Sequence, residues 1–289
     1  MAEIKTALTS SGVSMTARPV PRGKQPVSQQ YQFGPWTLTS TKSHILESEG
    51  HEREKFESEL ELPQLPEMVF ADNTLSLQHQ GGFGLVFTAL GALKLVDAHQ
   101  DPLKVAAAAE WQNARSSCEH IQNVVKLITG PTGQAKPGLP WTTSLGSRSH
   151  PSERIDLEKL KLREKIMFYD DVLLFEDELS DNGSSILSVK IRVMPSSFFI
   201  LLRFFMRVDN VMIRINDTRI YHQGGQNYIL EVSSQSKDDK VENLKVSSHL
   251  FTDPNEINKH LPLRAETFEK LEFPEEVTTC EPDSTVDTT

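Results

Sequence analysis

The sequence predicts an α+β fold with a β-rich centre, and three observations support this. Residues 187–193 alternate apolar and polar side chains, which is the period of a strand that buries one face. Residues 198–221 contain two apolar runs joined by Asp209-Asn210, a pair that tolerates the positive φ of a tight hairpin turn. Short helical stretches flank this centre, and one of them begins at Asp156, an acidic residue that suits a helix N-terminus.

Bulk composition limits the class of protein. The chain has 289 residues, of which 37% are hydrophobic, enough for a sizeable core. Its net charge of −10 argues against a nucleic-acid groove, which needs a basic face. Two cysteines suit a reducing compartment, and the longest apolar run, 198–206, is too short to span a membrane. We therefore expect a cytoplasmic protein that binds neither nucleic acid nor membrane.

The two ends of the chain differ in composition from the middle. Residues 1–30 are rich in Ser, Thr, Pro and Gly. Their prolines would break the helix of a mitochondrial transit peptide, which is the alternative interpretation. Residues 276–289 lack apolar periodicity. We expect a disordered extension over 1–30, a single domain over 31–275 and a disordered tail over 276–289.

Periodicity and turn residues predict the other elements in chain order. We expect strands at 36–39, 74–79, 83–88 and 187–193, and helices at 47–61, 89–98, 105–115 and 156–170. The Pro- and Gly-rich segment 128–150 is expected to be an irregular loop, and 237–240 a polar insertion. A short helix should start within 252–256, with Asp253 or Thr252 as its cap.

A two-residue turn at Asp209-Asn210 would set the register of the central hairpin. It would pair Val208 with Val211, Met206 with Ile213 and Phe204 with Ile215, and these six residues with Leu202 would form one apolar face. The opposite face would carry Arg203, Arg207, Arg214, Asn216 and Thr218.

Two charged residues continue the apolar parity of the second hairpin strand. Asp217 and Arg219 follow Ile213 and Ile215 at intervals of two, so all four side chains point to the same side. Two interpretations stay open. The charged residues form either a structural ion pair that closes the end of the sheet, or a polar anchor at the mouth of a cleft that holds a partner's peptide.

No catalytic set stands out in the sequence. The phosphate-loop, nucleophile-elbow and metalloprotease patterns are absent. The acids from Asp170 to Glu178 alternate with apolar residues, which favours a solvated strand edge over a divalent-cation site. Cys118-Glu119-His120 are adjacent, a spacing that rarely converges on one metal. We expect no catalytic residue, no metal and no cofactor.

Several long blocks of the chain match one known family. They are Phe33-Gly34-Pro35-Trp36, residues 65–70, 155–161, 173–179 and 188–199, then Ile213-Arg214-Ile215-Asn216-Asp217-Thr218-Arg219 with Tyr221-His222, and residues 250–256. On these blocks the sequence resembles the TOR-signalling-pathway regulator-like (TIPRL) family over about residues 33–274.

The resemblance implies a fold and a function. The implied fold is a two-layer antiparallel β-sheet, sandwich-like, flanked by short helices and containing a rift. The implied function is non-catalytic binding of the catalytic subunits of type 2A-like Ser/Thr phosphatases, usually inhibitory, in TOR-linked signalling. Fungal relatives act instead through a phosphatase-binding adaptor. We expect the partner subunit to contribute an extended tail.

The resemblance also implies binding residues. The family's phosphatase-binding positions fall on Ile155, Ile215 and Asp217, beside which we place Arg219. A fourth position, usually an acid, is Gly91 in this chain. The family's aromatic–Thr strand is reduced to Trp141-Thr142-Thr143, which would weaken the rift. Two other functions stay open: a metal-dependent enzyme that uses the acids at 170–178, and a β-sandwich carrier of a small apolar ligand.

Overall fold

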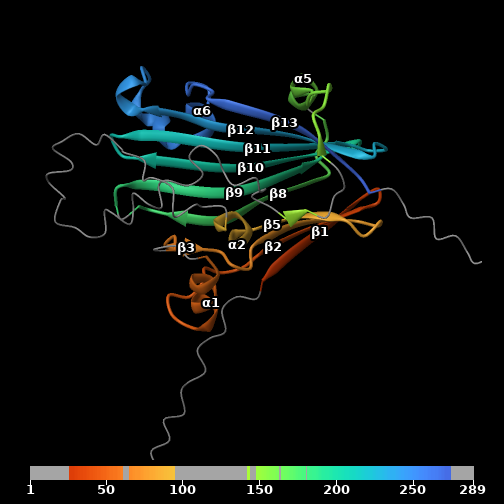
Figure 1. Ribbon diagram of the computed structural model, residues 1–289, viewed down its shortest axis with the longest axis horizontal. Coiled ribbons are helices and arrows are strands. Elements are labelled where there is room, and N and C mark those ends of the chain that lie inside the picture. Colours follow the sequence, from red (N-terminus) through yellow and green to blue (C-terminus); the bar gives the residue numbers. More distant parts are fainter. Residues whose placement is uncertain are drawn as a thin grey trace, which may run out of the picture.

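The computed structural model describes residues 26–60, 65–94, 142–143, 148–162, 164–179 and 181–274. Within these residues the chain forms two antiparallel β-sheets with a few short helices (Figure 1), as the resemblance implied. Five strands form the smaller sheet in the order β1-β2-β4-β5-β6: β1 (Val27–Phe33), β2 (Trp36–Lys42), β4 (Thr74–His79), β5 (Gly84–Thr88) and β6 (Thr142–Thr143).

In the part of the chain that the structure describes, the larger sheet has eight strands in the order β3-β8-β9-β10-β11-β12-β13-β7. They are β3 (Met68–Val69), β7 (Arg148–Ser149), β8 (Phe168–Asp177), β9 (Gly183–Val193), β10 (Ser197–Val208), β11 (Met212–Gln223), β12 (Tyr228–Lys240) and β13 (Ala265–Glu272). The helical elements are α1 (His51–Leu60), α2 (Ala89–Leu93), α5 (Leu157–Lys161), η1 (Val241–Asn243), η2 (Ser248–Thr252) and α6 (Pro254–Ile257).

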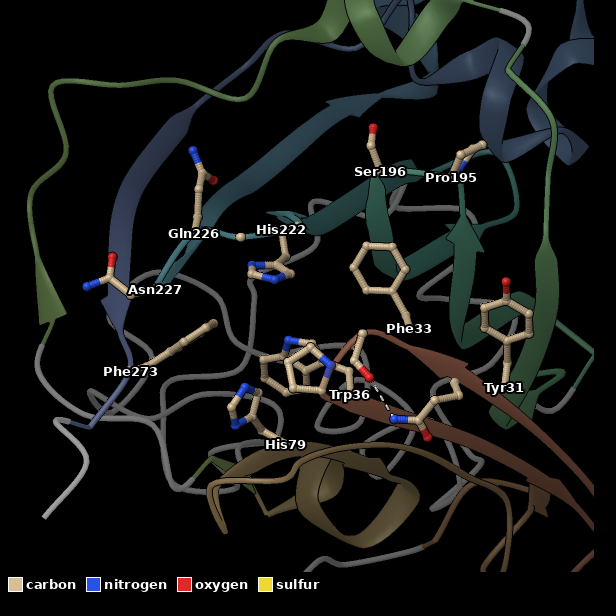
Figure 2. A pocket seen from close by; sticks show the side chains of 15 residues that line it. Tyr31, Phe33, Trp36, His79, Pro195, Ser196, His222, Gln226, Asn227 and Phe273 are labelled. Atoms are coloured by element: carbon tan, nitrogen blue, oxygen red, sulfur yellow. Dashed lines mark hydrogen bonds between the residues drawn. The ribbon is translucent and has the colours of Figure 1, made fainter. Parts of the chain in front are cut away.

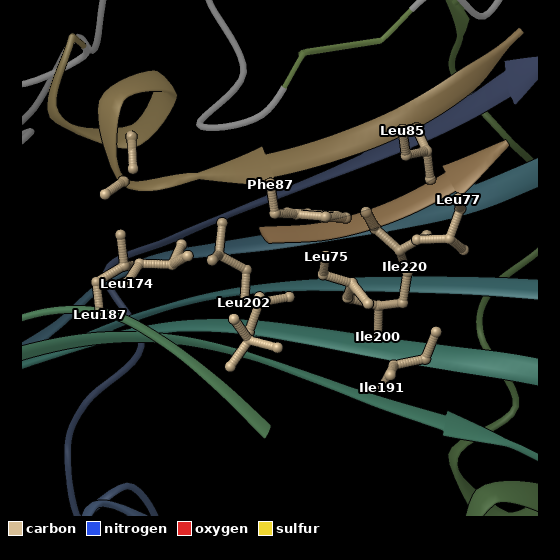
Figure 3. Close-up of a cluster of buried hydrophobic side chains, with 14 of the residues drawn as sticks. Leu75, Leu77, Leu85, Phe87, Leu174, Leu187, Ile191, Ile200, Leu202 and Ile220 are labelled. Atoms are coloured by element: carbon tan, nitrogen blue, oxygen red, sulfur yellow. The ribbon is translucent and has the colours of Figure 1, made fainter. Parts of the chain in front are cut away.

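The main core lies between the two sheets (Figure 3). Phe87 and its neighbours on β4 and β5 pack against Ile200, Leu202 and Ile220 of the larger sheet, and all are nearly or wholly buried. Burying each such side chain contributes ~1.5–3 kcal/mol to folding. We call the side of the larger sheet that faces the smaller sheet the inner face, and the other side the outer face.

Alternation along the strands gives the outer face its own apolar clusters. The first outer cluster contains Phe205, Ile213 and Ile215, covered by Ile257 and Leu261 from α6 and the residues after it. The second outer cluster contains Ile155, Tyr221, Leu230 and Val232 beside α5. Both ends of β11 are therefore covered on the outer face, and the middle of the strand lies between the two clusters.

The register of the central hairpin differs by one residue from the prediction. The loop has three residues rather than two, with Val211 N donating to Val208 O at 3.0 Å and Asn210 in the left-handed region at φ 58°. Val208 therefore pairs with Met212 and Phe205 with Ile215. A one-residue slip moves facing side chains to opposite sides, so the predicted Met206–Ile213 and Phe204–Ile215 pairs are wrong.

The slip decides which charged residues meet. Arg203 lies directly opposite Asp217 in the observed register, so both point to the outer face. The prediction that Arg203 lies on the face opposite to Asp217 is wrong. Met206 and Val208 instead join Met212 and Leu179 in a small cluster on the inner side of the hairpin tip.

The helix that starts at Asp156 is much shorter than predicted. Its first residues are capped as expected, because the Asp156 side chain accepts a hydrogen bond from Lys159 N. It ends at Lys161, and residues 168–177 form β8. Val172 and Leu174 are fully buried on β8 and Asp170 and Asp177 nearly so, since the strand pairs with β9 along its length. Tertiary pairing therefore overrides the local preference.

Four other boundaries change. β1 begins at Val27, inside the predicted extension, and α1 begins at His51 rather than at 47. Two short strands, β6 and β7, lie within the predicted loop 128–150, where β6 pairs with β5 and β7 with β13. Residues 237–240 belong to β12 and are not an insertion. The strands β2, β4, β5 and β9 and the Asp253 cap of α6 are confirmed.

The remaining predictions concern residues outside the described part of the chain. These are the disordered ends over 1–25 and 276–289, the helices after residue 94, and Cys118-Glu119-His120. Among the helices that the structure describes, none is long and apolar enough to cross a membrane.

Candidate functional site

Asp217 is buried between two arginines on the outer face. Its Oδ1 accepts from Arg203 Nε at 2.7 Å, and its Oδ2 accepts from Arg203 Nη2 and Arg219 Nη2, both at 2.8 Å. Arg203 Nη1 also donates to Asn255 Oδ1 on α6 at 2.8 Å. A two-point arginine–carboxylate pair is strong and directional. The network therefore joins β10, β11 and α6, and Arg219 is its most exposed ionic member at 21% of its side-chain surface.

The predicted Ile215 and Ile155 flank this network. Ile215 is fully buried in the first outer cluster, two residues from Asp217 on β11. Ile155, which lies just before α5, is 7% exposed in the second outer cluster. This cluster also contains Tyr221 of β11. The structure thus brings Ile155, Ile215, Asp217 and Arg219 to the outer face. The ion network of Asp217 and Arg219 lies between the first outer cluster, which contains Ile215, and the second, which contains Ile155.

Three cations surround the second outer cluster. The Arg154 guanidinium lies 3.8 Å over the Phe268 ring, Lys159 Nζ donates to Gln223 Oε1 at 2.6 Å, and Arg192 Nη2 donates to Leu160 O at 3.0 Å. We call Arg154, Lys159 and Arg192 the cationic rim. Within the described residues, none of the three is ion-paired with a carboxylate. Positive charge beside an apolar cluster favours a partner that is both apolar and acidic.

Gly91 lies elsewhere. It is in α2, a one-turn helix whose cap is Thr88, and Gly91 N donates to the Thr88 side chain at 3.0 Å. α2 follows β5 of the smaller sheet and lies across the molecule from α5 and α6 (Figure 1). The structure therefore does not bring Gly91 to the outer face.

The structure also contains a cleft, which lies away from the predicted partner-binding residues. It has a volume of about 560 Å³ and opens where the β1–β2, β9–β10 and β11–β12 turns meet the end of β4 and Phe273 (Figure 2). None of Ile155, Ile215, Asp217, Arg219 and Gly91 lines it. Asp217 is accordingly an ion-network residue of the outer face and does not stand at the mouth of this cleft.

Two lining residues of the cleft have unusual electrostatics. His222 is 2% exposed, and its Nδ1 lies 2.9 Å from Tyr228 O. Burial lowers the pKa of His222, and the nearby His79 lowers it further against the opposing hydrogen bond to Tyr228. Trp36 is fully buried, and its Nε1 has no hydrogen-bond partner in the described part of the chain.

The acids of β8 are engaged in the fold. Asp170 accepts from the side chains of Ser40 and Lys42 on β2, so it ties the two sheets together. Asp171 pairs with Lys190, and Asp177 accepts from Leu179 N. No group of three or more His, Cys, Asp or Glu that could hold a metal ion is found in the described ranges. No observation on β8 therefore favours the metal-dependent enzyme.

Comparisons with known proteins identify the family. A family model described as the TIP41-like family matches residues 68–245. The chain belongs to the TIP41-like family. It is 49% identical over 257 residues to the TIP41-like protein of Rattus norvegicus, covering 88% of this chain and 94% of the relative. The human TIP41-like protein is 48% identical over 257 residues, with 88% and 93% covered. The resemblance inferred from the sequence is thereby confirmed.

More distant members of the TIP41-like family carry a functional name. The type 2A phosphatase activator TIP41 of Saccharomyces cerevisiae is 33% identical over 235 residues, covering 75% of this chain and 65% of the relative. A Schizosaccharomyces pombe relative with the same description is 30% identical over 199 residues.

Sequence reasoning missed Arg203 and Asn255, which hold Asp217 in place. The sequence places Arg203 on the wrong face because Asp209-Asn210 fits a two-residue turn as well as a three-residue loop. Asn255 lies far along the chain, in a helix whose docking site no local pattern specifies. Trp36 and His222 stand within the matched blocks, but only the folded chain brings them together at the cleft.

Proposed function

We propose that this protein binds the catalytic subunit of a type 2A-like Ser/Thr phosphatase through its outer face and lowers the activity of that subunit as a stoichiometric partner. Membership of the TIP41-like family and the names of two fungal relatives support the phosphatase link. The observation that carries the proposal is the common face of Ile155, Ile215, Asp217 and Arg219.

The chemistry of this face supports an extended tail of the partner as the bound segment. The second outer cluster offers apolar contacts, and the cationic rim offers three charges without carboxylate partners among the described residues. A tail that carries apolar side chains and a carboxylate complements both. Gly91 lies on α2, so a partner that also contacts it must reach the far side of the molecule.

Direct binding is tested with the full chain and a purified type 2A catalytic subunit, without other proteins. We expect the double variant Lys159→Gln, Arg192→Gln to weaken capture about tenfold, since each lost charge-assisted hydrogen bond is worth ~1.5–3 kcal/mol and part is compensated by water. As a control, Lys55→Gln removes one positive charge from a 65% exposed side chain on α1, away from the outer face, and should leave capture unchanged. Equal capture by all three proteins would remove the outer face from the proposal.

The same mixture decides the direction of regulation. Inhibition predicts that phosphatase activity on a phosphopeptide falls as the protein approaches an equimolar amount, whereas the fungal names predict a rise. We further propose that the protein acts in the cytoplasm in TOR-linked signalling. If it acts through a phosphatase-binding adaptor, the purified subunit alone will not be captured, and adding the adaptor will restore capture.

A further inference from the structure

The cleft at the end of the two sheets has a neutral, aromatic lining that the proposed phosphatase contact does not use. The residues that line it include no Asp, Glu, Lys or Arg. Its walls carry the rings of Phe33, Trp36, His222 and Phe273, which converge in Figure 2. Gln226 and Asn227 from the β11–β12 turn stand at its edge. Such a lining excludes charged ligands and favours a flat, apolar one.

A buried donor at this cleft lacks a partner. Trp36 is 0% exposed, and its Nε1 makes no hydrogen bond within the described chain. An indole N–H can only donate, and an unbonded donor in an apolar interior is unfavourable. The Phe273 ring, whose centre is 5.5 Å from that of Trp36, is only partly buried, so the indole lies beside a ring that reaches the open side of the cleft. The site therefore demands an acceptor.

A buried acceptor lies beside the donor. Since the carbonyl of Tyr228 can only accept, the proton of His222 is on Nδ1, and a neutral ring leaves a lone pair on Nε2. The ring centres of Trp36 and His222 are 5.7 Å apart. Rings this close can both contact one small polar group of a ligand in the cleft. A hydroxyl is the group that accepts and donates through one atom.

We propose that this cleft binds a small neutral molecule with a flat apolar ring and a hydroxyl group, which accepts from Trp36 Nε1 and donates to His222 Nε2. The volume of about 560 Å³ suits such a ligand, because small-molecule sites range over ~300–1,000 Å³. The aromatic walls hold the ring, and the paired nitrogens select the hydroxyl. This site is separate from the outer face and does not depend on phosphatase binding.

Three small aromatic probes separate the contributions of the ring, of the hydrogen bond from Trp36 and of the hydrogen bond to His222. Toluene has the ring alone, 4-methylanisole adds an oxygen that only accepts, and p-cresol has a hydroxyl that accepts and donates. The readout is the indole N–H signal of Trp36 in the ¹⁵N-labelled full chain, assigned by its loss in Trp36→Phe, because the chain has three Trp. We expect a saturable shift with p-cresol, about tenfold weaker binding of 4-methylanisole for one lost hydrogen bond, and toluene weaker still.

A matched pair of histidine variants tests the acceptor. His222→Asn retains a donor toward Tyr228 O but removes the Nε2 lone pair, so p-cresol and 4-methylanisole should bind equally. His249→Asn makes the same change at an exposed site in η2 and should retain the tenfold preference. The proposal is overturned if no probe gives a saturable shift, if the three probes bind the natural chain equally, or if the preference survives His222→Asn. If His222→Asn fails to fold, the order of binding of the three probes to the natural chain still tests the proposed preference for a hydroxyl group.

Discussion

At the scale of single residues, buried ionic groups join β10, β11 and α6 on the outer face. Asp217 has three hydrogen bonds from two arginines and a side chain only 1% exposed, and its main partner Arg203 is 10% exposed. Removing one member of such a network leaves a buried charge without compensation. Of the two interpretations left open by the sequence, this geometry fits the structural ion pair, while partner binding by Asp217 stays a prediction.

Asp217→Asn should therefore destabilise the fold. We expect it to lower the free energy of unfolding by ~3–5 kcal/mol, because Arg203 keeps its charge in a buried position. Asp171→Asn is the matched control, since Asp171 pairs with Lys190 where both side chains are about 40% exposed, and it should cost less than ~1 kcal/mol. Urea denaturation of the three proteins measures the difference. Similar midpoints for the two variants would mean that solvent reaches Asp217.

His222 should make stability depend on pH. Its folded pKa is lowered by burial, so below its ordinary value of 6.5 the unfolded chain binds more protons than the folded chain. Stability should then fall as pH drops from 7 to 5, by at most ~1.4 kcal/mol for each unit of pKa difference. Asp170, whose pKa is lowered below 3.8, titrates outside this window.

His222→Asn isolates this contribution. The difference in melting temperature between pH 7 and pH 5 should be smaller in the variant than in the natural chain. His249→Asn again serves as the exposed control. If the pH dependence is unchanged in His222→Asn, groups other than His222 cause the loss of stability between pH 7 and pH 5.

At the scale of elements, capping decides how short helices hold the clusters of the outer face. α5 and α6 have five and four residues, too few to be stable alone, so their caps and packing must hold them. Asp156 caps α5 through Lys159 N at 2.9 Å, and Asp253 caps α6 through Asn255 N at 2.8 Å. α5 places Lys159 in the cationic rim, and α6 places Asn255 against Arg203.

Loss of either cap should loosen one helix and not the other. Asp156→Ala should cost ~1 kcal/mol and speed amide exchange in residues 157–161, while residues 254–257 keep their protection. Asp253→Ala should do the reverse. Under the proposed function, Asp156→Ala also weakens capture of the phosphatase subunit, because the cationic rim loses its support. Hydrogen exchange followed by mass spectrometry measures both, and equal exchange in both variants would show that packing alone holds the helices.

At the scale of the whole molecule, the two sheets share the hydrophobic core between them. Most of the large buried side chains belong to this core, and Asp170 bonds across it to β2. β1 is an edge strand, yet the Tyr31 ring stacks on Phe168 with centres 5.7 Å apart, and Phe33 meets Phe198 at 5.8 Å. The ordered domain therefore starts before the predicted boundary at residue 31.

Truncation of the N-terminal residues should show whether β1 contributes to stability. A chain of residues 26–275 should melt within a few degrees of the full chain, because residues 1–25 and 276–289 lack apolar periodicity. A chain of residues 34–275 lacks β1 and the rings of Tyr31 and Phe33, and it should melt roughly 5–15 °C lower. Scanning calorimetry compares the three. Equal melting of the two truncated chains would show that β1 contributes little.

The sequence by itself determined several strands, such as β2, β4, β5 and β9, which side chains share a face within a strand, and the family. The strands and their faces follow from the period of two along one strand, as in β9. The family follows from sequence blocks that can be matched without knowing any contact. Only the tertiary structure decided the hairpin register, the Arg203–Asp217 pair, the early end of the helix that starts at Asp156, and the cleft around Trp36 and His222. Each of these depends on a partner far along the chain or on the backbone conformation of a single loop residue, Asn210. A local pattern contains neither, because burial and pairing energies arise between segments rather than within them.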